Sequence, residues 1–158
     1  MSTTLLSQLS QATISTFEDL GFVVPSPEVD EHQAAIPLAW RARVRFSGPV
    51  EGWLEIRISD RSAHELATNM LGGQEALDPA VKRDAIGEIA NVICGNVVPA
   101  LGTPTDVFDL QAPELSDIHP GSPKADDEGF VLEMGLDGGR AELELCVERV
   151  GTFVGEPA

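Results

Sequence analysis

The stretch W-R-A-R-V-R-F-S-G-P-V-E-G-W-L-E-I-R-I, residues 40–58, alternates apolar and polar side chains on both sides of a short interruption. Alternation with a period of two is typical of strands that bury one face, and Ser-Gly-Pro at 47–49 is a turn signal. The stretch therefore predicts a β-hairpin whose apolar face meets a core. Its other face carries Arg41, Arg43 and Arg45. We expect these arginines to pair with carboxylates on neighbouring strands rather than with nucleic acid.

A second hairpin is predicted near the end of the chain. Apolar side chains alternate over residues 130–136 and again over 143–147, and Asp137-Gly138-Gly139 between them is typical of a hairpin turn. The polar face of this hairpin carries four glutamates: Glu133, Glu142, Glu144 and Glu148. They are natural partners for the arginines of the first hairpin.

Two helices flank the first hairpin. The spacing of apolar residues predicts an amphipathic helix over 3–20, which Gly21 ends. After the hairpin, Asp60 is the predicted N-cap of a helix that runs to about Leu71. Gly72-Gly73 stops this second helix.

A third and longer helix is predicted from Asp78-Pro79, with Asp as the cap and Pro at the first helical position, to about Val98. Proline and glycine predict a loop with a short strand over 102–118. Residues 25–33 are predicted as an exposed loop, and residues 119–129 as a flexible acidic loop.

The predicted elements follow the order α-β-β-α-α-β-β-β. This order favours an α+β (mixed α/β) fold in which an antiparallel sheet packs against helices. The 158 residues are most simply one domain, 1–158, with a tail at 151–158.

The composition excludes several functions. A net charge of −16 argues against unaided nucleic-acid binding and against docking on an anionic membrane. We expect a cytoplasmic protein, because the chain has neither an apolar run of about 18 residues nor a signal-peptide pattern. Cys94 and Cys146 are expected to be reduced and buried, and the histidines lack the spacing of metal ligands. Common enzyme motifs are absent, so any chemistry must come from a sparser pattern.

One face of the longest predicted helix supplies such a pattern. With 100° per residue, four residues lie within about 60° of one another, opposite an isoleucine stripe: Asp84, Glu88, Asn91 and Gly95. A solvated polar face would explain the charges alone. However, a glycine inside a helix costs about 1 kcal/mol relative to alanine, and Asn91 is a poor helix former. A glycine in this stripe leaves room for the backbone of another molecule.

The segment G-E-I-A-N-V-I-C-G-N, residues 87–96, resembles the signature helix of the CheC/CheX/FliY chemotaxis phosphatases. That pattern has an acidic or hydroxyl residue, then Glu, then Asn, and a proline further along the chain. Asp84, Glu88 and Asn91 match its spacing, and Pro113 is the matching proline, one residue closer than in the pattern. The element order is similar to that of the CheX type, which carries a single motif.

The resemblance implies a phosphatase that hydrolyses the aspartyl-phosphate of a response regulator such as CheY. Asn91 would orient the attacking water inside the regulator's site, and Glu88 would contact the regulator's lysine. Asp84, Gly95 and Pro113 would contact the partner. No cofactor or metal of its own is implied, because Mg²⁺ would be held by the regulator. The resemblance also implies a homodimer formed through sheet edges.

Two alternatives remain open from the residues. In the first, the chain is a non-catalytic adaptor that binds a response regulator or a flagellar or signalling protein through the same helix. In the second, it is a structural or ligand-binding module whose polar stripe is only solvated surface. Binding without faster loss of phosphate would favour the adaptor.

Overall fold

The computed structural model describes residues 2–74, 78–119 and 129–150. The predicted tail at 151–158 and most of the predicted loop at 119–129 lie outside these residues, so both stay predictions, as does the single domain over 1–158. Four α-helices are present in the described residues: α1 (Ser2–Gly21), α2 (Glu31–Ala34), α3 (Asp60–Met70) and α4 (Pro79–Val97). A short 3₁₀ helix, Val98–Leu101, follows α4. The strands are β1 (Leu38–Ser47), β2 (Val50–Ser59), β3 (Asp109–Leu110), β4 (Glu114–Asp117), β5 (Phe130–Leu136) and β6 (Gly139–Val150).

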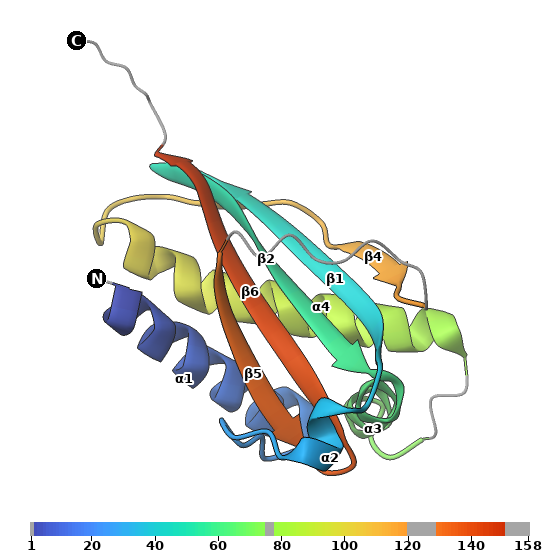
Figure 1. Ribbon diagram of the computed structural model, residues 1–158. Helices are drawn as coiled ribbons and strands as arrows, with labels where there is room; N and C mark the ends of the chain where they lie inside the picture. The colour runs from blue at the N-terminus through green and yellow to red at the C-terminus, as the bar shows by residue number, and fades with distance from the viewer. Residues whose placement is uncertain (1, 75–77, 120–128, 151–158) are drawn as a thin grey trace, which may run out of the picture.

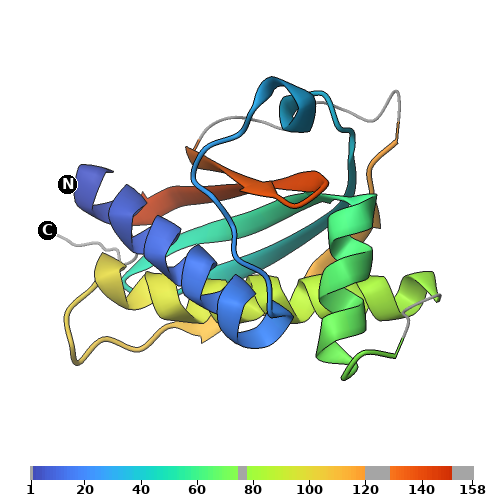
Figure 2. The ribbon, with the colours of Figure 1, turned by 90° about the horizontal axis from the view of Figure 1, so that it is seen from below.

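The strands form one six-stranded sheet in the order β3-β1-β2-β6-β5, and β4 also pairs with β1. Every described strand pair is antiparallel. Helices α1, α3 and α4 cover one face of this sheet, with α4 lying against β1 and β2 and α1 lying towards β5 (Figures 1 and 2). The prediction of an α+β fold with an antiparallel sheet packed against helices is therefore confirmed. The predicted order α-β-β-α-α-β-β-β also holds, with the short helix α2 and one further short strand added to it.

The core lies between the sheet and these helices. The predicted alternation places most apolar residues of both hairpins on the helix side, where they are buried or partly buried. Val147 is the exception: it is exposed, contrary to the predicted alternation, beside the point where the pairing of β2 and β6 shifts register. The fully buried large side chains include Leu54, Ile56, Leu143 and Leu145 from the sheet, Leu9 and Phe17 from α1, and Ile86, Ile89 and Ile93 from α4. Such burial stabilises the fold by about 1.5–3 kcal/mol for each large apolar side chain. Helix α4 is therefore held rigidly along one side.

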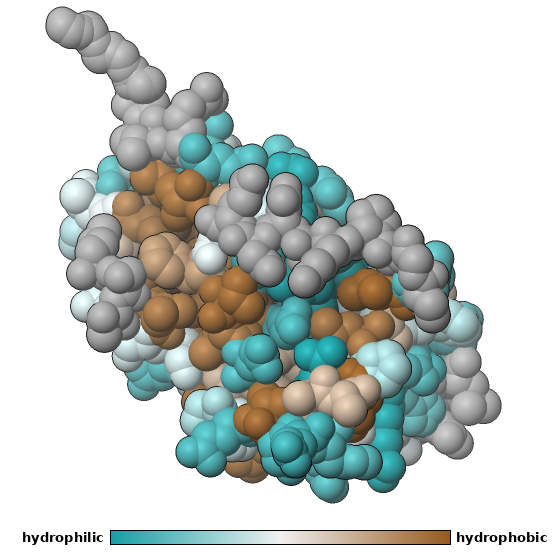
Figure 3. Space-filling model, in the orientation of Figure 1, coloured by the Kyte–Doolittle hydropathy of each residue, from teal (hydrophilic) through white to brown (hydrophobic). Residues whose placement is uncertain are grey.

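The other face of the sheet is charged but not fully solvated. Arg57 donates to Glu55, Glu142 and Glu144, with N–O distances of 2.5–3.0 Å. Arg43 donates to Glu55 at 2.8 Å and stacks 3.7 Å from the centre of the Trp53 ring. The predicted pairing of arginines with carboxylates is confirmed, but Glu55, Arg57 and Glu144 are also buried. Figure 3 shows this face, where apolar side chains gather over β5 and β6 beside the hydrophilic surface of β1.

Two other local predictions were wrong. Residues 25–33 do not form only a loop, because α2 begins at Glu31 behind the N-cap Asp30. Asp30 and Gln33 form a capping box, and the Gln33 side chain also donates to the Leu136 carbonyl at 2.8 Å. Asp60 is not the N-cap of α3: that position belongs to Ser59. Asp60 is the first helical residue, and its carboxylate accepts a hydrogen bond from Trp40 Nε1 at 2.8 Å.

Candidate functional site

Helix α4 begins and runs as its sequence predicts. The Asp78 carboxylate caps the helix by accepting from the Ala80 backbone amide at 3.0 Å, and Pro79 takes the first turn, where an amide donor is not required. The isoleucine stripe of α4 is fully buried against the sheet and α1. The helix is consequently a stiff support whose opposite side faces away from the core.

The predicted polar stripe lies on this opposite side. All four of its residues are exposed: Asp84, Glu88, Asn91 and Gly95. Glu88 lies three residues before Asn91, so its carboxylate and the carboxamide share one helical face. The Asn91 side chain is therefore accessible to another molecule.

Pro113 lies beside this stripe in space, although many residues separate it from the end of α4 in the sequence. A shallow hollow of about 380 Å³ is lined by Asp84, Gly87, Glu88, Asn91, Pro113 and Leu115. Gly87 permits this arrangement, because a Cβ atom there would lie 3.1 Å from Leu115 Cδ2 and 3.4 Å from Pro113. The structure thus brings Pro113 together with Glu88 and Asn91.

The two glycines of α4 have different environments. Gly87 is buried, and the chain's own β4 region fills the space beside it. Gly95 is exposed, and a Cβ atom there would meet only Leu110 Cδ2, at 3.9 Å, which is an ordinary contact. Among the described residues, the fold therefore leaves room for a side chain at position 95.

The cations of α4 lie away from the stripe. Lys82 Nζ is 3.4 Å from Asp60, and Arg83 Nη2 is 3.0 Å from Asp117. Neither Asp84 nor Glu88 has an ion pair within residues 2–74, 78–119 and 129–150. The stripe therefore presents uncompensated negative charge beside the neutral carboxamide of Asn91.

Helix α4 carries no reactive thiol. Cys94 and Cys146 are both buried, as predicted, and they are not joined in a disulfide. Burial raises the pKa of the Cys94 thiol to about 12, so the nucleophilic thiolate does not form near neutral pH.

In the described part of the chain, no three His, Cys, Asp or Glu side chains gather closely enough to hold a metal ion. No helix there combines the length and apolar character that crossing a bilayer requires.

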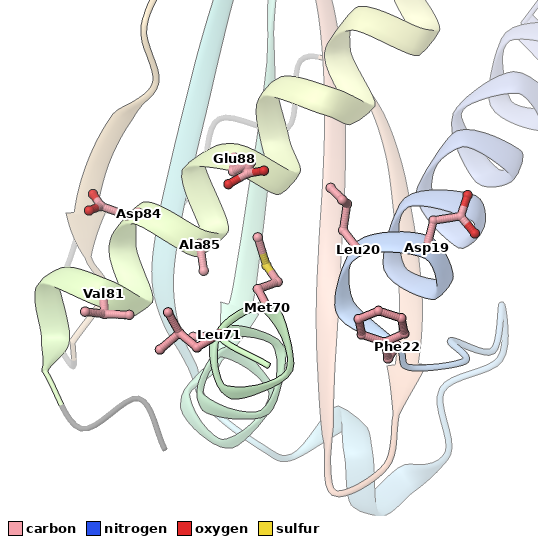
Figure 4. Close-up of a pocket in the computed structure, with 10 residues that line it drawn as sticks. Asp19, Leu20, Phe22, Met70, Leu71, Val81, Asp84, Ala85 and Glu88 are labelled. Carbon is pink, nitrogen blue, oxygen red and sulfur yellow. The ribbon is translucent and has the colours of Figure 1, made fainter. Parts of the chain in front are cut away.

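An apolar groove next to the stripe was missed by the sequence analysis. It has a volume of about 510 Å³ and lies between the end of α1, the end of α3 and the first turns of α4 (Figure 4). Phe22, Met70, Leu71 and Val81 contribute to its lining. Periodicity could not reveal the groove, since its residues come from three separate helix ends. The exposure of Phe22 depends on tertiary packing and leaves no sequence signal.

The comparisons with known proteins agree with this architecture. A family model described as chemotaxis phosphatase CheX matches residues 41–132. The chain belongs to the CheX family. The matched segment includes most of β1 and all of β2, α3 and α4 with the entire polar stripe, so the resemblance stated from residues 87–96 is confirmed.

Solved CheX structures have the same fold. CheX from Vibrio vulnificus is 19% identical, with 91% of this chain and 96% of that chain covered and a TM-score of 0.73. CheX from Desulfovibrio desulfuricans is also 19% identical, with 91% and 99% covered and a TM-score of 0.72. A CheX–CheY–BeF₃–Mg²⁺ complex from Borrelia burgdorferi gives 19% identity, 91% and 97% coverage and a TM-score of 0.66. No protein of curated function matches the chain in sequence.

Proposed function

We propose that this CheX-family chain hydrolyses the aspartyl-phosphate of a CheY-like response regulator. Asn91 enters the regulator's phosphate site and orients the attacking water, while Glu88 pairs with a lysine of the regulator. The observation that carries the proposal is the exposed carboxamide of Asn91, one turn from Glu88 on a helix whose other side is locked in the core. The Borrelia burgdorferi CheX crystallised with CheY, BeF₃ and Mg²⁺ supports a partner of this class.

The chemistry requires little from the chain itself. An acyl phosphate is already reactive, and what the reaction lacks is a water held in line with the scissile P–O bond. Positioning alone can lower the barrier substantially, without a covalent step. A carboxamide suits this role, because it both donates and accepts hydrogen bonds and does not titrate. Mg²⁺ would be held by the regulator and would neutralise charge on the phosphoryl oxygens there.

Glu88 and the remaining stripe residues have docking roles in this proposal. A charge-assisted bond from the regulator's lysine to Glu88 would set the depth and register of the inserted helix. Asp84 and Pro113 line the hollow around Glu88 and Asn91, and Gly95 would let the partner's backbone approach the next turn. These contacts would position the partner while Asn91 acts on the water.

A phosphate-release assay tests the proposal. Response regulators from the same cell, phosphorylated with a small phosphodonor, should lose phosphate faster when the chain is added. Asn91→Ala should reduce the acceleration about 100-fold, since misplacing a reacting group costs this much. The matched control is Gln11→Ala, which removes an exposed carboxamide from α1 and should keep the wild-type rate.

The same assay separates the phosphatase from the adaptor. Complex formation with a BeF₃⁻-loaded regulator should be measured alongside the phosphate half-life. Binding with an unchanged half-life would replace the phosphatase with the adaptor, and an unchanged rate in Asn91→Ala would remove Asn91 from the mechanism. The homodimer through sheet edges stays a prediction, and a monomer by light scattering would contradict it.

A further inference from the structure

The apolar groove beside the polar stripe has an exposed aromatic wall. Leu20 and Phe22 from the end of α1 face Val81 and Ala85 of α4 across Met70 of α3 (Figure 4). Phe22 is 71% exposed and Leu71 is 44% exposed. Large apolar side chains gathered in a concave site favour binding of an apolar group, because both surfaces leave water together.

Packing elsewhere forces Phe22 into this position. Gly21 lies so close to α3 that a Cβ atom would collide with Leu66 Cδ2, and the Asn69 side chain donates to the Gly21 carbonyl at 2.7 Å. The left-handed conformation after the helix therefore falls on Phe22, with φ of 53°. A bulky residue in this region is strained. The backbone conformation at Phe22 therefore leaves the ring largely exposed at the groove.

The rim of the groove is acidic. Asp19 from α1 and Asp84 and Glu88 from α4 line it, and none of the three has an ion pair among the described residues. Lys82 and Arg83 are paired on another side of α4, with Asp60 and Asp117. An occupant that is apolar at its centre and basic at its edge would complement this rim.

The groove is continuous with the stripe, because Asp84 and Glu88 line both the groove and the hollow that contains Asn91. A partner whose lysine reached Glu88 would therefore cover the mouth of the groove. A second copy of this chain does not complement the groove, since the surface beside its own groove carries the same acidic rim. An anionic membrane is disfavoured by the same charge.

We infer that the groove is a specificity pocket for the response regulator and binds one of its apolar side chains, flanked by lysine or arginine, outside its phosphate site. This inference rests on the proposed function, whose partner it describes more closely. The basic flank answers an electrostatic difficulty, because an acidic phosphate site alone would be repelled by a chain of net charge −16. Regulators without such an apolar and basic pair would bind weakly and be poor substrates.

The test is a titration with a regulator loaded with BeF₃⁻ and Mg²⁺. Phe22→Asn, which tolerates a positive φ, and Leu71→Gln should each raise Kd at least tenfold. The rate of phosphate loss at saturating regulator should stay unchanged in both. Val24→Ser is the matched control, since Val24 is 79% exposed but does not line the groove.

A charge variant tests the rim. Asp19→Asn should reduce the salt dependence of Kd, whereas Glu18→Gln, an exposed neighbour outside the groove, should not. Equal salt dependence in these two variants would overturn the electrostatic part of the inference. Asn91→Ala separates the two proposals, because it should reduce the acceleration about 100-fold while leaving the contribution of the groove to Kd unchanged.

The possible results bear differently on the specificity pocket and on the phosphatase proposal. Wild-type Kd in both Phe22→Asn and Leu71→Gln overturns the specificity pocket and leaves the phosphatase proposal standing. A wild-type chain that binds the regulator without hydrolysis overturns the phosphatase, while the Kd comparison still decides the pocket. Loss of self-association in Phe22→Asn with unchanged regulator binding makes a second copy the occupant. A chain that binds no loaded regulator overturns both proposals.

Discussion

On the outer face of the sheet, the carboxylates of Glu55 and Glu144 are buried and accept charge-assisted bonds from Arg57, whereas on α4 the carboxylates of Asp84 and Glu88 are exposed and have no ion pair among the described residues. A buried charge must be paired, because removal from water costs several kcal/mol per ion. An exposed carboxylate remains hydrated and needs no partner in the fold. The comparison teaches that carboxylates on the outer face of the sheet support the fold, whereas carboxylates on α4 are available to another molecule.

The buried region is electrically balanced. Three arginines and three glutamates are linked by ion pairs in it: Arg43, Arg57, Arg140, Glu55, Glu142 and Glu144. Burial by itself lowers the pKa of Arg57, but hydrogen bonds from its guanidinium to the three glutamates raise that pKa above its ordinary value. Arg57 therefore stays charged around neutral pH.

Removing Arg57 should have the largest effect on stability. Arg57→Met leaves Glu55 and Glu144 buried with less positive charge, so the free energy of unfolding should fall by about 3–5 kcal/mol. Urea denaturation measures this change. Arg45→Met is the control, since Arg45 pairs with Glu114 at the exposed edge and should cost less than about 1 kcal/mol.

A second substitution sharpens this result. Adding Glu144→Gln to Arg57→Met removes one of the uncompensated charges, so the double variant should regain part of the lost stability. A loss of stability that is the same for Arg57→Met and Arg45→Met would contradict the contrast between the two regions.

Removing a charge from α4 should weaken partner binding while leaving the stability of the fold almost unchanged. Glu88→Gln should change the free energy of unfolding by no more than about 0.5 kcal/mol, as expected for an exposed residue. Its affinity for a loaded regulator should fall by about tenfold or more, because a hydrogen bond to a charged group contributes about 1.5–3 kcal/mol. Calorimetric titration and urea denaturation of one preparation measure both quantities. A large loss of stability would place Glu88 with the structural carboxylates instead.

Replacing the glycines of α4 should have smaller effects on stability, and these effects should differ between the two positions. Gly95→Ala should stabilise the folded chain by up to about 1 kcal/mol, because alanine favours the helix and the new methyl group has room. The same variant should bind the regulator more weakly if that surface receives the partner's backbone. Gly87→Ala should gain less stability, because Leu115 and Pro113 have to move. Unchanged regulator binding in Gly95→Ala would remove position 95 from the interface.

Asp60 is intermediate between the two regions, because it is exposed but paired. The hydrogen bond from Trp40, helped by the charge of Lys82, lowers the pKa of Asp60 below its ordinary value. A lowered folded-state pKa means that Asp60 stabilises the fold above its unfolded pKa of about 3.9, and that this contribution is lost as the pH falls through the folded value. Asp60→Asn should therefore be less stable than the wild type at pH ~7, and the gap should narrow as the pH falls below the unfolded pKa of about 3.9 and through the lowered folded value. A series of urea titrations from neutral to acid pH checks this, and a gap that does not change with pH would contradict it.

The local patterns of the chain predicted most of the fold and the stripe. Alternation over 40–58 and the spacing of isoleucines in α4 depend only on neighbouring residues, so both could be identified from the sequence. The capping box of Asp30 and Gln33 was also a local signal, and the prediction of a loop overlooked it. Pro113 could be matched to a family pattern by spacing, but its contact with α4 could not be derived from spacing alone.

By itself, therefore, the sequence determined the two hairpins, the long helix, and the shared outward face of Glu88 and Asn91. Only the tertiary structure decided that Pro113 packs beside Gly87, that Glu55 and Glu144 are buried, and that Phe22 forms the wall of a groove. The physical reason is the range of the interactions. Helical and strand periodicities arise from adjacent backbone geometry, whereas burial, ion pairing and grooves arise where chain segments distant in sequence compete for the same space.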